Sequence, residues 1–463
     1  MTNIYCILSV YMPIRRIGQG AAYVVAVSMG YGHERAASAL RSFAVGKKVI
    51  LANDYVGIPD RDKKIWSTGQ TWYERISRFK RVPLFGSAAF EVMDHMQEIE
   101  AFYPKRDLSD PTLQVKQTYA LIRKAKNCKH LIDKLAENPK PLICTFMTPA
   151  FAAEEFGYPE DIYLVVCDAD VSRAWVPLDP RKSRIKYFAP TGRVVERLRL
   201  YGVREENILF TGFPLPMENV GGPEADFVLS DLSRRMCNLD PQGVFATHSQ
   251  TMLEATFGKT FCAAVQNKRP SPISLTFAVG GAGAQREVGV VAAKSLMRDI
   301  LDDQLTLTLV AGTRPEVGEY FASELKRTPL KRALADGRLS ILSTPKRAEY
   351  FSSFNKLMRK TDILWTKPSE LSFYAGLGIP VIMAPTVGSQ EDFNRNWLYQ
   401  VGGGTDALDP LYTGEWLWDW IQGGALARMA WNGYTNAPTH GAYRIEDVVH
   451  GREWSMHELP LVV

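Results

Sequence analysis

A glycine-rich turn near the N-terminus has the residues for contact with an anion. Gly30 and Gly32 follow an apolar, strand-like run, and His33 opens an alanine-rich helical pattern. Glycine lets a backbone turn tightly and approach a ligand, and a helix N-terminus offers unpaired N–H groups to an anion. A histidine at such a helix start can be tuned for acid–base chemistry. The G-x-G-x-x-G dinucleotide fingerprint is absent, and a plain strand-to-helix turn with a structural histidine is the alternative.

A second glycine-rich turn follows a strand-like run in the other half of the chain. It contains Gly280, Gly281 and Gly283. Open α/β sheets bind ligands at the carboxyl ends of their strands, so both turns are expected where ligands lie. The chain has no Walker motif. One such turn in each half therefore predicts two loops that face each other across a cleft.

Polar residues also follow a strand-like run at residues 362–365. Lys367 can neutralise a phosphate, Ser369 can cap the next helix, and Glu370 can accept two hydrogen bonds from a ribose diol. These residue types predict a nucleotide site at this strand end. A simple capping arrangement at an exposed helix start is the alternative.

The strand-like run at residues 381–384 is followed by Gln390, Glu391 and Asn394. Spacings of three and four residues place these side chains on one side of a helix. Polar groups that converge at a strand end fit the hydroxyl groups of a sugar. The alternative is a helix face that is simply solvated.

Two aspartates, Asp168 and Asp170, close a strand-like run in the first half, with Arg173 shortly behind them. A D-x-D pattern can hold a divalent cation against a nucleotide diphosphate. It lies in the half opposite the nucleotide-binding candidates, and no further ligands are evident, so contact with an acceptor is the preferred interpretation. The six cysteines show no CxxC spacing and no histidine at metal-ligand spacing, so the sequence predicts no metal site.

Short apolar runs alternate with helical patterns along the whole chain, and these are the elements that must carry the candidate residues. Strands are expected at residues 21–28, 48–53, 142–146, 163–167, 185–188 and 208–211, and again at 273–279, 305–310, 339–342, 362–365 and 381–384. Alternation on this scale implies an α/β fold with one parallel sheet and right-handed crossovers in each half.

Prolines and glycines shortly after residue 211 interrupt regular structure and mark a break between the halves. We therefore expect an N-terminal domain at residues 1–215, a C-terminal domain at residues 216–430 and a tail at residues 431–463. The length of 463 residues is sufficient for two domains that each bury a core.

Composition and charge exclude several classes of protein. The formal net charge of +5 is small for this length and gives no case for a nucleic-acid partner. The longest apolar runs have the length of strands and fall short of a membrane span. The N-terminal apolar run precedes its positive charges, which is the wrong order for a secretory signal, and the scattered cysteines suit a reducing cytoplasm. We expect a cytoplasmic protein.

Taken in order, these segments resemble the glycosyltransferase family that contains the N-acetylglucosaminyltransferase of peptidoglycan synthesis and the monogalactosyldiacylglycerol synthases. SMGYGHERAASAL is similar to the family's first loop and helix, and CDADVSRAW is similar to a stretch of its first domain. YFAPTGRVVERLRLYGVREENILFTGFPLP looks like its last N-domain strand, helix and linker. VGGAGAQ resembles the glycine loop of the second domain, and DILWTKPSELSFYAGLGIPVIMAPTVGSQEDFNRNWL resembles the donor signature.

The resemblance implies a GT-B fold, in which two Rossmann-like domains with parallel sheets face a central cleft. It implies an inverting transfer of a hexose or N-acetylhexosamine from a nucleotide-diphosphate sugar, UDP-linked, to an acceptor hydroxyl. The nucleotide sugar would be a co-substrate, with no tightly bound cofactor or metal. The resemblance also implies that the C-terminal tail packs back toward the N-terminal domain.

The resemblance also assigns roles to residues. The pyrophosphate would lie over the second glycine loop and Lys367, with the ribose near Glu370, the only acid available in that segment. The expected donor-binding residues are Gly280, Gly281, Gly283, Lys367, Ser369, Glu370, Gln390, Glu391 and Asn394. The expected acceptor-binding residues are Gly30, Gly32, Asp170 and Arg173. His33 or Asp168 would take the proton of the acceptor hydroxyl.

The acceptor implied by the resemblance is a lipid, a glycolipid or a small molecule, with peripheral contact to an anionic membrane surface. Basic and apolar residues are mixed at residues 75–85, which suits anionic headgroups, and an ordinary surface helix is the alternative. Two other functions stay open for the same fold. They are a nucleotide-sugar epimerase and a non-catalytic protein that binds nucleotides or glycans.

Overall fold

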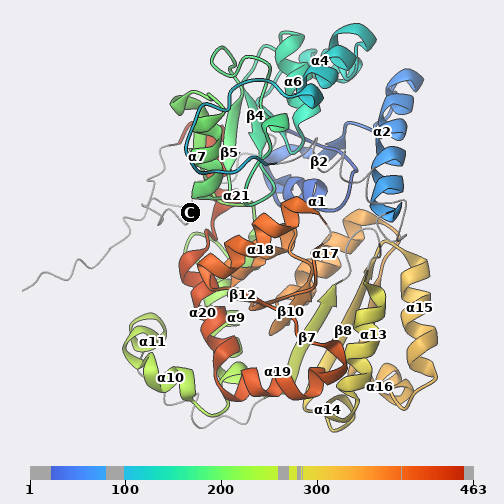
Figure 1. Cartoon of the computed structure of the whole chain (residues 1–463), viewed down its shortest axis with the longest axis vertical. Coiled ribbons are helices and arrows are strands. Elements are labelled where there is room, and N and C mark those ends of the chain that lie inside the picture. Colours follow the sequence, from blue (N-terminus) through green and yellow to red (C-terminus); the bar gives the residue numbers. More distant parts are fainter. Residues whose placement is uncertain are drawn as a thin grey trace, which may run out of the picture.

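The computed structural model describes residues 22–79, 99–258, 271–278, 283, 285–386 and 388–452. These residues form two α/β domains (Figure 1). The first domain, coloured blue to green, lies at the top of the view, and the second, coloured yellow to red, lies below it. Each domain is built around a six-stranded sheet, and every pair of neighbouring strands runs parallel.

The first sheet has the strand order β2-β1-β3-β4-β5-β6. Its strands are β1 (Ala22–Ala26), β2 (Ala44–Leu51), β3 (Leu142–Cys144), β4 (Ile162–Val165), β5 (Lys186–Ala189) and β6 (Ile208–Phe210). The central strands β3 and β4 are buried along their whole length, as expected for parallel strands that are covered on both faces. This burial explains why they read as continuous apolar runs.

The second sheet has the strand order β12-β11-β10-β7-β8-β9. Its strands are β7 (Ile273–Ala278), β8 (Leu305–Gly312), β9 (Leu339–Ser343), β10 (Ile363–Thr366), β11 (Val381–Met383) and β12 (Gly404–Asp406). In chain order this is the 3-2-1-4-5-6 arrangement of a Rossmann sheet. The order reverses between β7 and β10, and in the first sheet it reverses between β1 and β3, so each sheet has one topological switch point.

Helices connect the strands and flank the sheets. The first domain has α1 (Gly32–Ala39), α2 (Asp60–Phe79), α4 (Leu113–Ala125), α5 (Lys129–Ala136), α6 (Met147–Glu155) and α7 (Gly192–Leu200), with 3-10 turns at Arg41–Phe43, Arg173–Trp175 and Glu205–Asn207. In chain order, α8 (Met217–Val220), α9 (Asp226–Leu239), α10 (Val244–His248) and α11 (Gln250–Phe257) come after the last strand of the first sheet and before the first strand of the second.

The second domain and the tail contain the remaining helices. They are α13 (Arg286–Ser295), α14 (Met297–Leu301), α15 (Pro315–Lys326), α16 (Lys331–Asp336), α17 (Arg347–Met358), α18 (Ser389–Val401), α19 (Thr413–Gln422), α20 (Ala425–Asn436) and α21 (Gly441–Val449), with 3-10 segments at Glu370–Leu377 and Pro410–Tyr412. No helix in the described part of the chain is long and apolar enough to cross a bilayer.

The two parallel sheets confirm the predicted α/β fold with two Rossmann-like domains, and three details differ. The edge strand β12 was not predicted, because its three residues include no large apolar side chain. The helical pattern of residues 113–136 predicts one helix, but the structure divides it into two, since Lys126 and Cys128 take positive φ angles of 54° and 64°. The helical pattern of residues 371–376 predicts an α-helix, but the structure forms a 3-10 helix at Glu370–Leu377.

The interface between the domains is a shared apolar core. Phe213, from the connection after the first sheet, stacks on Phe373 of the second domain with ring centroids 4.6 Å apart and planes 7° from parallel. One buried cluster joins strand residues of the first domain to the 3-10 segment at Glu370–Leu377. Because interiors are closely packed, this continuous core holds the domains in a defined relative position.

The C-terminal tail runs back across this interface. The Arg444 guanidinium on α21 donates to the main-chain carbonyl of Thr211 (2.9 Å), and the ring of His450 lies 6.4 Å from that of Phe43 in the first domain. Figure 1 shows α21 beside the first domain, although α20, just before it in the chain, belongs to the second. The chain therefore crosses between the domains twice.

Candidate functional site

The carboxyl ends of the two sheets meet at the domain interface, and the first glycine turn takes part in this contact. Tyr31 lies between β1 and α1, and its hydroxyl bonds both the side chain and the main-chain N–H of Thr313 after β8, each at 2.9 Å. Gly312 is required beneath the ring: it has a φ of +69°, and a Cβ there would lie 2.6 Å from the Tyr31 hydroxyl. The turn predicted to face the other domain is thus hydrogen-bonded to it.

Gly30 and Gly32 occupy different parts of this turn. Gly30 is exposed and has a φ of +99°, a left-handed conformation that favours glycine. Gly32 begins α1, and a Cβ at its position would lie 3.4 Å from Oε2 of Glu370. The turn is therefore open on one side and in contact with the second domain on the other.

His33 is half-buried in an aromatic pocket of the first domain. Its ring centroid lies 5.1 Å from that of Phe146 and 5.5 Å from that of Trp175. Burial lowers the pKa of His33 to about 4, against the opposing effects of a backbone hydrogen bond at Thr145 and the charge of Glu370. The imidazole is therefore neutral at pH 7 and able to accept a proton.

A buried ion pair joins α1 to the 3-10 segment after β10. Nε of Arg35 donates to Oε1 of Glu370 at 3.2 Å, and a terminal nitrogen of Arg35 lies 3.3 Å from the Tyr350 hydroxyl. The guanidinium carbon is 4.4 Å from the centre of the Phe354 ring. Glu370, expected to bind a ribose, thus has one oxygen engaged by the first domain, so a ribose would share or displace this contact.

Arg35 was not recognised as a candidate from the sequence. The signal is its position within an alanine-rich helix, next to Ala36 and Ala37, which are fully buried. A long cation on the apolar face of a helix requires an anionic partner from another element. The sequence shows that such a partner is needed but does not identify Glu370, which is 335 residues away.

A second polar connection between the domains joins Asp168 to Asn394. The Asn394 amide donates to Oδ1 of Asp168 (3.0 Å), and its oxygen accepts from the main-chain N–H of Ala169 (2.7 Å). Asp168 follows β4 of the first sheet, whereas Asn394 lies on α18 and is completely buried. The hydrogen-bond requirement of the buried amide is met only with the domains together.

The electrostatic environment of Asp168 suits a base. Burial raises its pKa to about 6, and the negative charges of Glu370 and Glu391 act in the same direction, whereas the hydrogen bond from Asn394 and the charge of Lys367 oppose them. Glu370 also acts on the pKa of His33. The two candidate bases therefore lie within the electrostatic reach of the same carboxylate.

The candidates of the second domain also pair with one another. Lys367, after β10, forms an ion pair with Glu391 on α18. Asn394 donates a second hydrogen bond to the Pro368 carbonyl at 3.4 Å. Gln390 precedes Glu391 on the first turn of α18, and its side chain is half-buried. The structure thus brings the two segments predicted for phosphate and sugar side by side.

The prediction that Ser369 caps the next helix is wrong. Ser369 occupies the N-cap position of the 3-10 segment, but its side chain makes no capping hydrogen bond. The backbone there has φ and ψ of −121° and −150°. The main-chain N–H of Ser369 instead bonds the carbonyl of Lys367 at 2.9 Å, which closes a tight turn.

Two predicted acceptor contacts, Asp170 and Arg173, have partners within the fold. Both oxygens of Asp170 bond Arg197, at 3.0 and 2.8 Å, in a bidentate pair that is almost fully buried. The Arg173 guanidinium donates to three main-chain carbonyls, those of Ser109, Val176 and Pro177. The prediction that Arg173 contacts an acceptor does not fit this arrangement, because its hydrogen-bonding groups are already used.

Of the second glycine turn, the structure describes Gly283. Gly280 and Gly281 lie outside the described residues, and Gly283 has a φ of +68°. A Cβ on Gly283 would come within 3.0 Å of a Val317 methyl group, so the turn packs closely on α15 at this point. The described residues contain no group of three or more side chains suited to hold a metal ion.

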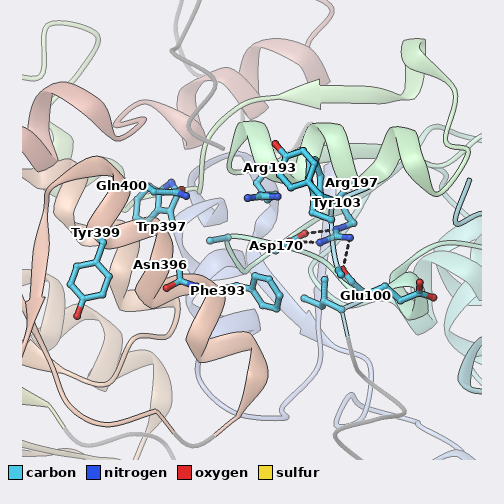
Figure 2. Close-up of a pocket in the computed structure, with 14 residues that line it drawn as sticks. Glu100, Tyr103, Asp170, Arg193, Arg197, Phe393, Asn396, Trp397, Tyr399 and Gln400 are labelled. Carbon is cyan, nitrogen blue, oxygen red and sulfur yellow. Dashed lines mark hydrogen bonds and ion pairs between the residues drawn. The ribbon is translucent and has the colours of Figure 1, made fainter. Parts of the chain in front are cut away.

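A cavity of about 440 Å³ adjoins the Asp168–Asn394 pair. The first domain contributes Ala169, Asp170, two arginines of α7 and the segment at residues 99–103, and the second contributes one face of α18. Figure 2 shows Arg193 between the aromatic side chains of Tyr103 and Trp397, with the Asp170–Arg197 pair to its lower right in the view. The complete lining is Ile99, Glu100, Ala101, Phe102, Tyr103, Ala169, Asp170, Arg193, Arg197, Phe393, Asn396, Trp397, Tyr399 and Gln400.

Sequence reasoning missed this cavity because its walls come from distant segments. The spacing of Phe393, Trp397 and Gln400 on α18, at four and three residues, was a readable signal of one helix face. Nothing in the sequence places that face against Arg193 of α7.

We compared the chain with known protein families, curated proteins and solved structures. A family model described as "Domain of unknown function (DUF6938)" matches residues 331–413, a range that includes the candidates from Lys367 to Asn394. No curated protein matches the chain.

Several solved structures show a weak overall similarity to this chain. MurG of Acinetobacter baumannii has 12% identity and a TM-score of 0.41, and the match covers 94% of this chain and 99% of that chain. The UDP-GlcNAc 2-epimerase of Methanocaldococcus jannaschii, in complex with UDP-GlcNAc and UDP, has 11% identity and a TM-score of 0.40, with coverage of 93% and 99%. MnaA of S. aureus, a co-structure with UDP, has 11% identity and a TM-score of 0.44, with coverage of 94% and 96%. At these scores the description of the fold rests on the two sheets themselves.

Proposed function

We propose that this chain is an inverting glycosyltransferase, which moves a hexose or an N-acetylhexosamine from a UDP-linked sugar to an acceptor hydroxyl. The observation that carries the proposal is the Asp168–Asn394 contact. It brings a carboxylate of raised pKa, from the first domain, against the helix of the second domain that carries the candidate sugar-binding side chains. A base at such a junction can act on an acceptor while the donor is held opposite.

The second domain would hold the donor. The pyrophosphate would lie near Lys367 and the second glycine turn, and the sugar hydroxyls would lie near Gln390 and Glu391. Lys367 is paired with Glu391 in this structure, so an arriving diphosphate would compete with that carboxylate for the ammonium group. The negative charge that develops on the departing diphosphate would then be stabilised by Lys367.

The reaction would use a single displacement. The oxygen of the acceptor hydroxyl attacks the anomeric carbon of the sugar, and its proton passes to the carboxylate of Asp168. The bond between that carbon and the diphosphate oxygen breaks with its electron pair leaving on the nucleoside diphosphate. His33, neutral at pH 7, is the alternative base.

The proposal includes no tightly bound cofactor or metal, and it includes a cytoplasmic location. Contact with an anionic membrane surface remains a prediction, because the segment at residues 75–85 lies outside the part of the chain whose side chains are described. A lipid and a small molecule are both kept as acceptor classes.

The test has two stages. Thermal shift measurements with UDP-glucose, UDP-galactose and UDP-GlcNAc identify the donor, because a ligand that binds only the native state raises its apparent stability. Incubation of the stabilising donor, radiolabelled in the sugar, with candidate acceptors then measures transfer. Transfer that disappears in Asp168→Asn, with donor binding retained, supports the proposal.

A nucleotide-sugar epimerase is the second candidate. It is favoured by the titratable side chains near the junction, since the charge of Glu370 raises the pKa of both Asp168 and His33 and an epimerase must remove and return a proton. Conversion of the donor to an isomer in the absence of any acceptor would identify it. Tight binding without turnover of any nucleotide sugar would instead point to a non-catalytic binding protein.

A further inference from the structure

The cavity between α7 and α18 contains one positive charge that the described residues do not neutralise. Arg193 is half-buried, and no carboxylate partner for it occurs in the described ranges of the chain. The other charges of the lining are paired, Arg197 with Asp170 and Glu100 with Arg106. A cation in a semi-enclosed cavity with no internal partner attracts an anionic ligand.

The position of the Arg193 guanidinium is set by an aromatic ring. Its central carbon lies 4.1 Å from the centre of the Phe102 ring, close enough for a cation–π contact. Phe102 is itself buried, and Arg197 holds the preceding loop through a hydrogen bond to the Glu100 carbonyl (2.8 Å). A planar guanidinium held in this way is suited to bind a phosphate through two parallel hydrogen bonds.

The remaining walls suit a ring with hydroxyl groups. Tyr103 and Tyr399 expose 60% and 42% of their surfaces, although large aromatic side chains are usually more deeply buried. Asn396 adds an exposed amide from α18. Aromatic faces together with a few placed polar groups are the usual lining of a small-molecule site, and the volume of about 440 Å³ is within the usual range.

We propose that this cavity binds the acceptor, and that the acceptor is a phosphorylated sugar. The inference rests on the proposed function and adds the chemical class of its second substrate. Ala169 and Phe393 line the cavity and directly adjoin Asp168 and Asn394 in the chain, so the cavity begins beside the proposed base. The phosphate would bind Arg193, the sugar ring would lie against the aromatic walls, and a ring hydroxyl would point toward Asp168.

The first experiment measures binding by isothermal titration calorimetry. The full chain is titrated with glucose 6-phosphate, with glucose and with uridine monophosphate, and the titrations are repeated on Arg193→Gln and Arg199→Gln. Arg199 is a matched control, because it lies on the same helix, carries the same charge and is not part of the cavity lining. We expect Arg193→Gln to weaken glucose 6-phosphate binding by about tenfold or more, and Arg199→Gln to leave it unchanged.

A second variant guards against a folding artefact. Asn396→Trp adds a large side chain to an exposed position on the opposite wall, so it should block the cavity without disturbing a core. Asn396→Trp should abolish glucose 6-phosphate binding. The melting temperatures of Arg193→Gln and Asn396→Trp should both stay near that of the parent chain. UDP-sugar binding, measured in parallel, should be unchanged in both.

Three results would overturn the inference. No saturable binding of glucose 6-phosphate at roughly millimolar concentrations would remove it. An equal loss in Arg199→Gln would reduce it to a general effect of charge, and preferential binding of uridine monophosphate would make the cavity a nucleotide site. If glucose 6-phosphate binds through Arg193 but no sugar is ever transferred, the proposed function fails while the cavity remains a sugar-phosphate site, so the two failures are distinguishable.

Discussion

The amide of Asn394 lies 3.0 Å from the carboxylate of Asp168, and this single contact links the carboxyl end of one sheet to the helix that follows a strand of the other. The oxygen of the same amide accepts a hydrogen bond from the Ala169 N–H, so Asn394 both orients the carboxylate and fixes the main chain next to it. A buried amide with a donor and an acceptor of matching geometry specifies one relative placement of the two domains.

Asp168→Asn tests whether this carboxylate is the base. The substitution keeps the size of the side chain and removes its ability to take a proton. We expect sugar transfer to fall by about 10²–10⁴-fold, whereas the dissociation constant for the UDP-sugar changes little. Radiolabel transfer and calorimetry measure the two quantities on the same preparation.

His33→Ala gives the matching test for the alternative base. If Asp168 takes the proton, the loss of a neutral imidazole packed between Phe146 and Trp175 should lower stability more than it lowers the rate of transfer. Loss of transfer with intact binding and an unchanged melting temperature would assign the role of base to His33.

The pH dependence of transfer follows from the raised pKa of Asp168, which is about 6. A base must be ionised to accept a proton, so kcat/KM should rise with pH up to about 6 and level off above it. Asn394→Asp places a second carboxylate beside the first. The rise of kcat/KM should then occur at higher pH, because like charges disfavour ionisation. A rise of kcat/KM centred near the ordinary aspartate pKa of 3.8 would contradict the assignment of Asp168 as the base.

Stability should respond to pH in the opposite sense at the two candidate bases. The native Asp168 has a pKa raised from 3.8 to about 6, so its contribution to stability is present at low pH and is lost as pH rises to about 6. The native His33 has a pKa lowered from 6.5 to about 4, so stability is gained as pH rises from about 4 to 6.5. The two slopes nearly cancel in the parent chain.

The substitution Asp168→Asn separates the two contributions to the pH dependence of stability. In Asp168→Asn only the histidine contribution remains, so the free energy of unfolding in urea should rise more steeply between pH 4 and 6 than it does in the parent chain. The difference is expected to be on the order of 1–3 kcal/mol across that range. Identical pH profiles for the two proteins would show that Asp168 titrates normally.

The buried Arg35–Glu370 pair is expected to stabilise the closed arrangement of the domains. Arg35→Met leaves an unpaired carboxylate, and Glu370→Gln leaves an unpaired guanidinium, so either change should cost about 3–5 kcal/mol of unfolding free energy. The double variant should recover part of the loss, because no buried charge then lacks a partner. A double-mutant cycle by urea denaturation measures the coupling, and strictly additive losses would show that the pair is not coupled.

The fold was largely predictable because its signals are local. Apolar runs such as β3 and β4 are buried on both sides and therefore read as strands without reference to any partner. β12 was not predictable, because an edge strand of Gly, Thr and Asp has no apolar run. Lys126 and Cys128 divide a helical pattern because they take positive φ angles. Residues other than glycine rarely adopt such angles, so their residue types do not predict the break.

The site was predictable only in part, because its pairings span the two domains. Strand ends identified Asp168 and Asn394 as candidates, but their mutual contact depends on how the domains dock. Glu370 was predicted to meet a ribose and has Arg35 as its partner here. Arg193 gives no signal in the sequence, because an arginine near a helix start is ordinary until the fold places it opposite Trp397 and Tyr103.

The two chain crossings lie against each other, and this limits how the cleft can open. A Cβ on Gly212 of the first crossing would lie 2.4 Å from Cβ of Pro438 in the second, and one on Gly441 would lie 2.2 Å from the Phe213 carbonyl oxygen. If the domains part, we expect crossings this close to act as one paired hinge, so that the domains turn about a single axis. The Arg35–Glu370 and Asp168–Asn394 contacts must then part in the same swing. Ligand capture should therefore approach a ceiling at high ligand concentration, set by how often the hinge opens and not by diffusion.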